Sequence, residues 1–177
     1  MKENLIKIIT DEDFHENSIE LSNPRLRYGS RGIVVNKDGK IAVFHKKNKN
    51  EYKLPGGGFE INENPESAFI RETLEETGCE VEIIKQLGIT EEYKSLDNFK
   101  QKSYVFVAQV VKDYKKLNLT EEEKLSGGEL VWLDLKEAYT KISESINYLK
   151  CSKEIDLYHS KFIVYRDSEI LKYYMEK

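Results

Sequence analysis

Residues 57–79 read GGFEINENPESAFIRETLEETGC, and this stretch carries the signals that decide the fold. Asn64 is suited to cap the start of a helix, and Pro65 is suited to its first position. Gly78 is typical of a residue that ends a helix. The spacing therefore predicts a helix over residues 65–77. We expect its buried face to comprise Ala68, Phe69, Thr73 and Leu74.

Three glutamates lie close together on that predicted helix. Glu72, Glu75 and Glu76 stand at positions i, i+3 and i+4, so a helix places them on one face. Three adjacent carboxylates repel one another unless a hard cation such as Mg²⁺ or Mn²⁺ neutralises them. A solvated acidic face is the alternative interpretation, in which Arg71 pairs with Glu75 in a surface network.

A run of glycines precedes the helix. Gly56, Gly57 and Gly58 are expected to exclude a regular element and to form a tight loop. Such a loop can direct its carbonyl oxygens to the point that the acidic helix face reaches, and Glu63 stands at the helix entrance. Oxygen ligands of two types that meet at one point favour a metal site over a solvated face.

The spacing of these residues resembles the Nudix box, G-x5-E-x7-R-E-U-x-E-E-x-G-U, in which U is a bulky aliphatic residue. Every polar and glycine position of the box is matched within residues 57–79. Thr73 and Cys79 stand at U positions where Ile, Leu or Val is usual, a departure that concerns packing rather than chemistry. The resemblance includes the approach at residues 53–60 and covers roughly residues 27–139.

The resemblance implies an α+β fold, a Nudix-like α/β/α sandwich around a mixed β-sheet. Two apolar runs flank Asp38-Gly39, which predicts a β-hairpin over residues 31–44. Residues 91–102 are expected to form a loop or the end of a hairpin, and residues 167–174 a helix. Further strands are expected at residues 79–84, 103–111 and 129–133.

A single domain is expected over residues 1–177, because strands and helices interleave along the chain. Its core would lie at about residues 27–140, followed by a mostly helical extension at residues 141–177. Six tyrosines are concentrated toward the C-terminus, which indicates either a homodimer interface or a half-buried helical layer. They are Tyr139, Tyr148, Tyr158, Tyr165, Tyr173 and Tyr174.

For the chemistry, the resemblance implies Mg²⁺-dependent hydrolysis of a nucleoside diphosphate linked to another group, with Mn²⁺ as a possible replacement. In this family water attacks one phosphorus in line with the bond that breaks. Arg71 would orient the glutamates, and Glu63 would brace the junction of loop and helix. The metal ligands would be Glu72, Glu75, Glu76 and the carbonyl of Gly57. The catalytic residues would be Glu63, Arg71, Glu75 and Glu76.

The general base is left open by the resemblance, because some family members use a glutamate of the box and others a glutamate on a distant loop. Glu121, Glu122 and Glu123 lie on such a predicted loop, and Glu122 is the candidate for substrate contact. A solvated acidic turn is the alternative. Arg27 and Arg31 are candidates for binding a substrate phosphate, since a guanidinium group can hold two oxygens.

Other polar and aromatic residues have simpler explanations. Tyr52 or Phe59 could stack on a base, although an aromatic residue beside a glycine loop is as often part of the packing. Glu91 and Glu92 are expected to be solvated at the end of a strand, and Trp132 to belong to the core. A solvated charge run is also favoured for Lys46, Lys47 and Lys49.

Charge and composition restrict the partners. The net charge of −4 argues against a protein that grips long nucleic acids, but a bound cation would still allow a small nucleotide substrate. No run is apolar enough to cross a membrane, and the N-terminus lacks the apolar segment of a secretory signal, which predicts a cytoplasmic location. Cys79 and Cys151 are therefore expected to be free thiols.

Three functions remain open. By elimination of subfamily motifs, such as a proline about 15 residues beyond the box, we favour hydrolysis of a (deoxy)nucleoside triphosphate to monophosphate and pyrophosphate. The second possibility is a hydrolase of nucleotide sugars, dinucleoside polyphosphates or RNA 5′ ends. The third is a nucleotide-binding module without activity, which the intact set of glutamates disfavours.

Overall fold

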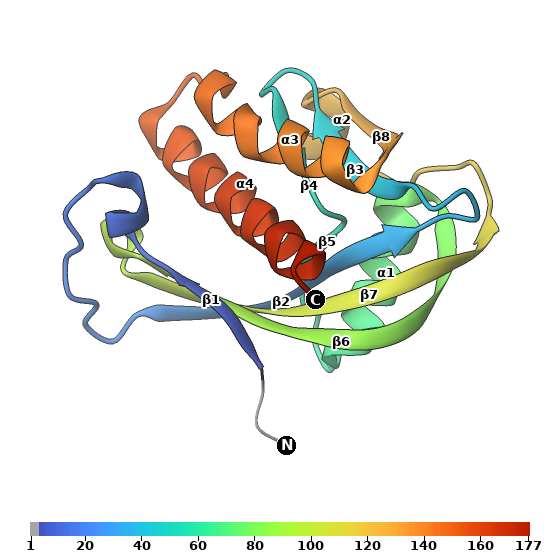
Figure 1. Ribbon diagram of the computed structural model, residues 1–177. Helices are drawn as coiled ribbons and strands as arrows, with labels where there is room; N and C mark the ends of the chain where they lie inside the picture. Colours follow the sequence, from blue (N-terminus) through green and yellow to red (C-terminus); the bar gives the residue numbers. More distant parts are fainter. Residues whose placement is uncertain (1–3) are drawn as a thin grey trace.

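A mixed sheet of eight strands separates two helical layers in the computed structural model, which describes residues 4–177 (Figure 1). The strand order is β1-β6-β7-β2-β3-β4, with β5 paired to β2 and β8 paired to β3. The strands are β1 (Leu5–Ile9), β2 (Arg25–Val35), β3 (Ile41–Lys46), β4 (Glu51–Lys53), β5 (Gly56–Gly58), β6 (Cys79–Lys94), β7 (Phe99–Asp113) and β8 (Gly128–Leu133).

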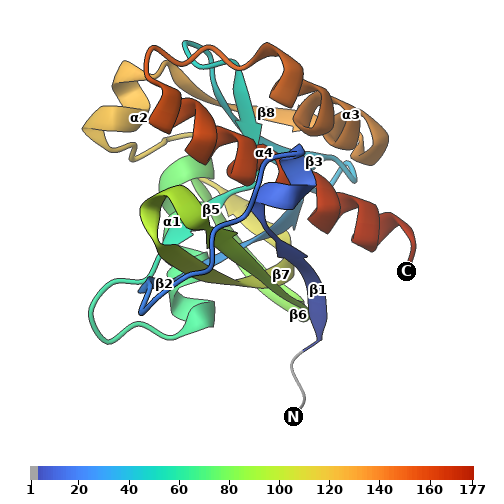
Figure 2. The same cartoon turned by 90° about the vertical axis from the view of Figure 1, so that its left-hand side faces the viewer.

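The helices cover both faces of this sheet. One face is covered by α3 and α4, and the other by α1, which confirms the expected α/β/α sandwich (Figures 1 and 2). The α-helices are α1 (Pro65–Thr77), α2 (Glu121–Leu125), α3 (Leu135–Ser145) and α4 (Glu154–Met175). Short 3₁₀ turns are η1 (Asp11–Phe14), η2 (Ser95–Asp97) and η3 (Ile146–Tyr148). No helix within residues 4–177 is both long and apolar enough to span a bilayer.

The predicted hairpin is confirmed, and it leads into a long parallel pairing. Val35 of β2 faces Ile41 of β3, and Gly39 adopts a φ of 75° in the turn between them. On its other side β2 pairs in parallel with β7 along its whole length. Arg25, Arg27 and Arg31, which alternate along β2, therefore share one face of the sheet.

The glycine run is a strand rather than the irregular loop predicted above. Gly56–Gly58 pairs with β2 in antiparallel fashion, with Ser30 opposite Gly57. The absence of side chains explains this pairing, because a Cβ on Gly29 would come within 2.7 Å of the Gly57 carbonyl oxygen. Glycine thus lets this short strand lie closely between β2 and α1.

Helix α1 begins and ends where the sequence predicts. The Asn64 side chain accepts a hydrogen bond from the Ser67 N–H at 2.8 Å, and Gly78 ends the helix with a φ of 68°. Ala68, Phe69 and Thr73 are buried as expected. The assignment of Leu74 to the buried face is wrong, since it is 42% exposed. Its place on the inward side is taken by Glu76 and Thr77, which are both buried.

Residues 91–102 form the end of a hairpin, which is one of the two predicted alternatives. β6 continues to Lys94, a turn follows at residues 95–98, and β7 begins at Phe99. The polar side chains of this segment are not all solvated, because Glu92 and Lys94 are buried. Their charges are compensated inside the protein, as described below.

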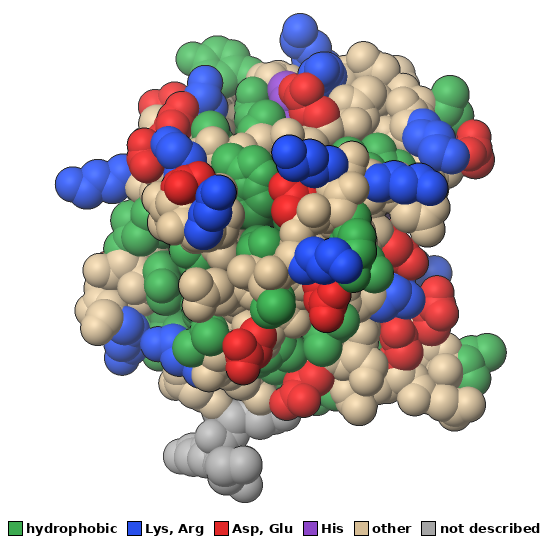
Figure 3. Space-filling model, turned by 90° about the vertical axis from the view of Figure 1, so that its right-hand side faces the viewer, with side chains coloured by type: hydrophobic (Ala, Val, Ile, Leu, Met, Phe, Trp, Pro, Cys, Tyr) green, Lys and Arg blue, Asp and Glu red, His purple; other side chains and the backbone are tan. Residues whose placement is uncertain are grey.

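Two apolar clusters fill the sandwich. One lies between the sheet and the helices α3 and α4, and the other lies between the sheet and α1. Val164, Ile170 and Leu171 of α4 are fully buried, so the C-terminal segment forms one layer of the core. Trp132 is partly buried against the cluster beneath α1. On the surface seen in Figure 3, basic and acidic side chains are interspersed.

Candidate active site

A cavity of about 340 Å³ opens between the sheet, β5, α1 and α4. Its lining includes seven Lys or Arg residues and four Asp or Glu residues, so that it is rich in positive charge. The basic residues are Arg25, Arg27, Arg31, Lys46, Lys53, Lys94 and Arg166. The acidic residues are Glu72, Glu76, Asp97 and Glu123. Three of the four predicted metal ligands, Gly57, Glu72 and Glu76, therefore line a pocket suited to an anion.

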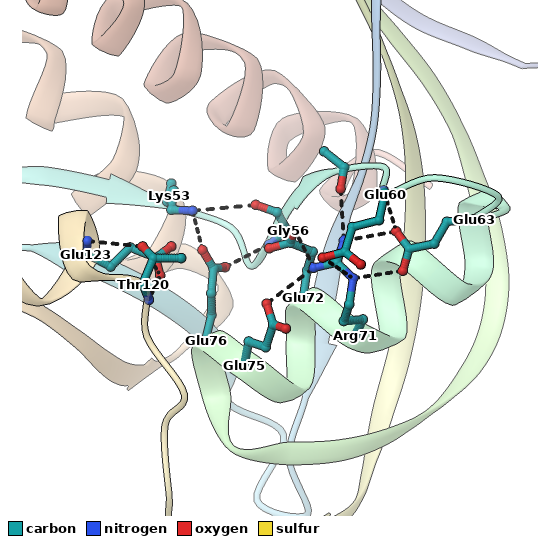
Figure 4. A network of polar contacts seen from close by, with 11 residues as sticks. Lys53, Gly56, Glu60, Glu63, Arg71, Glu72, Glu75, Glu76, Thr120 and Glu123 are labelled. Atoms are coloured by element: carbon teal, nitrogen blue, oxygen red, sulfur yellow. Dashed lines mark hydrogen bonds and ion pairs between the residues drawn. The ribbon is translucent and has the colours of Figure 1, made fainter.

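Glu76 is the most deeply buried of the three predicted glutamate ligands, with 1% of its surface exposed. Its carboxylate accepts a hydrogen bond from the Gly56 N–H at 2.9 Å and forms an ion pair with Lys53 (Figure 4). Burial raises the pKa of Glu76 to about 7, and the contacts with Lys53 and Gly56 only partly oppose that rise. A buried carboxylate of this kind gains from a cation placed beside it.

Glu72 lies against the neighbouring glycine. A Cβ built on Gly57 would come within 2.3 Å of its Oε1 atom, so the carboxylate occupies the space that a side chain would fill. Because Glu76 contacts Gly56, the two carboxylates face consecutive residues of β5. The glycine segment and the acidic helix face therefore lie against each other, through the Gly56 N–H and the bare Gly57 Cα.

Arg71 connects the helix to the segment that precedes it (Figure 4). Its Nε and Nη2 atoms donate to the two oxygens of Glu63 at 2.7 and 2.9 Å, and Nη2 also donates to the Gly58 carbonyl at 3.0 Å. Its Nη1 donates to Glu72 at 2.9 Å and to Glu75 at 3.2 Å. These hydrogen bonds from Arg71 hold the pKa of Glu63 below its usual range.

Glu75 is turned away from the cavity in this structure. It faces Arg71 and lines a separate surface hollow with Leu74 and Tyr114. No group of three potential metal-binding side chains is gathered among residues 4–177. The donors nevertheless fit a hard divalent cation, because Glu72, Glu76 and the backbone of Gly57 offer oxygen atoms at one wall of the cavity. Glu75 would have to leave Arg71 to join them.

The acidic turn contributes a different residue from the one predicted. The side chain of Glu122 is 75% exposed and pairs with Lys49 at 3.6 Å, away from the cavity. Glu123 lines the cavity and interacts with Glu76. Burial raises the pKa of Glu123, but the Thr120 N–H, the charge of Lys53 and the contact with Glu76 outweigh burial and hold it below the usual range. α2 orients Glu123, whose carboxylate accepts from the Thr120 N–H at 2.9 Å.

Both arginines predicted to bind phosphate line the cavity. Arg27 is exposed beside Gly58, whereas Arg31 is 4% exposed and lies 3.8 Å from Asp167. Burial and the charge of Arg166 lower the pKa of Arg31 to about 10, so it remains charged at neutral pH. The two aromatic candidates lie elsewhere: Tyr52 stacks on His45, and Phe59 stacks on other rings.

The sequence reasoning missed several charged residues of the cavity. Lys94 pairs with Glu92 at 3.3 Å, and Arg166 donates to Glu92 at 2.9 Å from the distant helix α4. The prediction that Glu92 is solvated is therefore wrong, because these cations compensate its charge inside the protein. The adjacent pair Arg166-Asp167 in an otherwise apolar helix face was the local signal that could have revealed this network.

Comparison with known proteins agrees with this geometry. A "MutT-like protein" from Streptomyces ambofaciens is 37% identical over 71 residues, which cover 40% of this chain and 46% of that protein. An "RNA pyrophosphohydrolase" from Hydrogenovibrio crunogenus is 30% identical, covering 58% of this chain and 70% of that protein. The mouse "Diphosphoinositol polyphosphate phosphohydrolase 3-alpha" is 29% identical, covering 71% of this chain and 67% of that protein.

The fold and the family profile point the same way. A solved NUDIX hydrolase from Nitrosomonas europaea superposes with a TM-score of 0.56 at 18% identity, covering 77% of this chain and 88% of that chain. Residues 25–152 match the family described as "NUDIX domain". That match includes the glycine strand, the acidic helix and most of the sheet. The chain therefore belongs to the NUDIX family of hydrolases, whose members act on phosphoanhydrides.

Proposed function

We propose that this protein is a Mg²⁺-dependent pyrophosphohydrolase that cuts a phosphoanhydride bond in a small phosphorylated substrate. The observation that carries the proposal is the placement of Glu72 and Glu76 against consecutive glycines of β5, at one wall of a cavity rich in Lys and Arg. NUDIX proteins generally use divalent metal ions. Carboxylates suit such an ion, and basic side chains suit the phosphates around it.

The metal would be held by Glu72, Glu76 and the Gly57 carbonyl, with Glu75 joining after release from Arg71. When bound, the ion supplies positive charge that polarises a phosphoryl oxygen. Mn²⁺ would serve the same ligands. Arg71 acts as a positioning residue, because its five short contacts join Glu63, Glu72, Glu75 and Gly58.

Proton transfer requires a carboxylate beside the attacking water. Glu123 and Glu76 line the same cavity and interact with each other, and their pKa values are shifted in opposite directions. Glu123 is held in its charged form, so it would accept the proton as the water oxygen bonds to phosphorus. The anhydride oxygen then leaves on the second phosphate. Glu123 replaces Glu122 as the candidate on the acidic turn.

A (deoxy)nucleoside triphosphate is the first substrate to test, with nucleotide sugars, dinucleoside polyphosphates and RNA 5′ ends as alternatives. A more highly phosphorylated small molecule is favoured by a specific observation, the seven basic residues that line the cavity. The similarity to a protein named for diphosphoinositol polyphosphates is consistent with that choice. A binding module without activity remains the competing function.

A substrate panel with Mg²⁺ or Mn²⁺ tests the proposal through release of phosphate and pyrophosphate. We expect Glu76→Gln to lower kcat by at least about 10²-fold, as for the loss of a major electrostatic group. Glu123→Gln should lower kcat much more than Glu122→Gln, which serves as its exposed control. Turnover that chelator leaves unchanged would contradict the mechanism. A protein that binds nucleotides but hydrolyses none would favour the binding module.

A further inference from the structure

Arg166 of α4 has one uncommitted donor deep inside the protein. Its Nε donates to Asp167 at 2.8 Å, and its Nη1 donates to Glu92 at 2.9 Å. Its Nη2 finds no hydrogen-bond partner within the described part of the chain, although the residue is only 1% exposed. Because Arg166 lines the cavity, a molecule in the cavity can supply the missing acceptor.

Arg31 of β2 also has a buried donor without a partner among the residues that the structure describes. Its Nη1 lies 3.8 Å from Asp167, and its Nε is likewise unpartnered among residues 4–177. Burying a charged donor without an acceptor costs free energy, so two such donors at one cavity are unusual in a folded protein. Their shared position indicates a site built for an acceptor.

The charges around these donors do not balance. Arg31, Arg166 and Lys94 carry three positive charges, whereas Glu92 and Asp167 supply two negative charges among them. All five residues are buried. An interior with an excess of one positive charge attracts an anion, and guanidinium groups suit the oxygens of a phosphate.

The location of this cluster relative to the acidic helix matters. Arg31 faces Gly56 across the β2–β5 pairing, so one end of the cluster adjoins the proposed metal wall. Arg25 lies six residues earlier on the same face of β2, roughly 20 Å away along the strand. Lys94 faces Phe99, and Phe99 in turn faces Arg25. The basic lining therefore extends well beyond one anhydride group.

The aromatic lining argues against a base at this end of the cavity. Phe99 is the only Phe, Tyr or Trp among the lining residues that the structure describes. Arg25 lies 4.8 Å from the centre of its ring, and Lys94 lies 5.5 Å from it. Because these two cations already lie near the ring of Phe99, that ring is not free to stack on a nucleobase. A phosphate therefore fits this region better than a nucleobase does.

We propose that Arg31, Lys94 and Arg166 form an anion subsite that binds a substrate phosphate separate from the anhydride to be cut. This inference rests on the proposed function and names its substrate class: a small molecule with phosphate groups at both the metal wall and the α4 side of the cavity. α4 supplies Arg166 and, through Asp167, a contact to Arg31, so the C-terminal helix takes part in substrate selection.

Calorimetric titration of the full chain with inorganic phosphate, in the presence of a chelator, tests the subsite without metal or turnover. We expect wild-type protein to bind phosphate and Lys94→Met to bind it about tenfold more weakly. Lys100→Met is the matched control. Lys100 also pairs with a strand glutamate, at 3.1 Å from Glu91, and also lies over an aromatic ring, but it is not part of this cavity.

Two further variants keep the test decisive. Arg166→Lys retains the positive charge but loses the two-pronged guanidinium group, so it should also weaken phosphate binding. It serves as the test if Lys94→Met does not fold. Glu122→Gln should keep phosphate binding, because Glu122 is exposed and does not line the cavity. Equal phosphate binding by wild type, Lys94→Met and Arg166→Lys would overturn the subsite, as would no binding by wild type.

The two proposals can fail separately. Lys94-dependent phosphate binding without any Mg²⁺-dependent hydrolysis would leave the subsite standing and remove the proposed function. Mg²⁺-dependent hydrolysis together with phosphate binding that is unchanged in Lys94→Met and Arg166→Lys would support the proposed function and remove the subsite.

Discussion

Glu72 packs its carboxylate so closely against Gly57 that a Cβ on the glycine would lie 2.3 Å from its Oε1 atom. Any other residue at position 57 would force the side chain of Glu72 to move. The contact thus connects the absence of a side chain in β5 to the position of a proposed metal ligand on α1.

Gly57→Ala should therefore reduce kcat by about 10²-fold, because displacing a reacting group by about 1 Å costs this much. Gly58→Ala is the matched control for kcat, since its Cβ would displace the end of the Arg27 side chain, at 2.7 Å, which is a candidate phosphate contact and not a metal ligand. Steady-state kinetics of the two variants with Mg²⁺ provides the measurement. Equal activity of the two variants would show that the position of Glu72 is not critical.

Metal affinity should depend on pH through Glu76. Its pKa is raised to about 7 by burial, and the metal binds only the ionised carboxylate. As pH falls below about 7, protons compete with the ion, so Mn²⁺ affinity should fall up to tenfold per pH unit. Above that pH it should level off. Titration of Mn²⁺ across this range checks the slope, which should become shallower in Glu76→Gln.

Arg71→Lys should lower kcat about 10- to 100-fold with a smaller change in KM. A lysine keeps the positive charge but cannot reach Glu63, Glu72, Glu75 and the Gly58 carbonyl at once. The separation of kcat from KM identifies Arg71 as a positioning residue. A purely structural role would instead lower the melting temperature and leave the activity of the folded fraction unchanged.

Asp167 should be important for stability, because it compensates Arg31 and Arg166 in the interior and accepts the Leu54 N–H at 2.8 Å. We expect Asp167→Ala to lower the free energy of unfolding by about 3 to 5 kcal/mol. Asp134→Ala is the control, because Asp134 pairs with Lys40 on the surface at 3.3 Å and its side chain makes no capping hydrogen bond to α3. We expect this variant to lose about 0 to 1 kcal/mol of the free energy of unfolding. Denaturant titration compares the two, and similar losses would contradict the interior role of Asp167.

Local sequence signals predicted the parts of the site that depend on neighbours along the chain. Asn64 and Gly78 set the ends of α1, and helical spacing put Glu72 and Glu76 on one face. The turn at Asp38-Gly39 set the hairpin. Arg27 and Arg31, chosen because a guanidinium group can hold two oxygens, both line the cavity.

Charged residues in other elements were misjudged, because only distant partners explain their burial. Glu92 is expected from the sequence to be solvated at the end of a strand, but Arg166 pairs with it from a position more than seventy residues away. Thr120 and Glu123 match a capping box in the sequence, but only the tertiary structure shows that Glu123, and not Glu122, lines the cavity.

The sequence by itself determined the acidic helix, its glycine partner and the family resemblance, since turns, caps and helical periodicity act over a few residues. Tertiary structure decided which charges share the cavity, and that Glu123 rather than Glu122 lines it. The physical reason is that burial of a charge depends on its counter-charges, and here α4 contributes them from the far end of the chain.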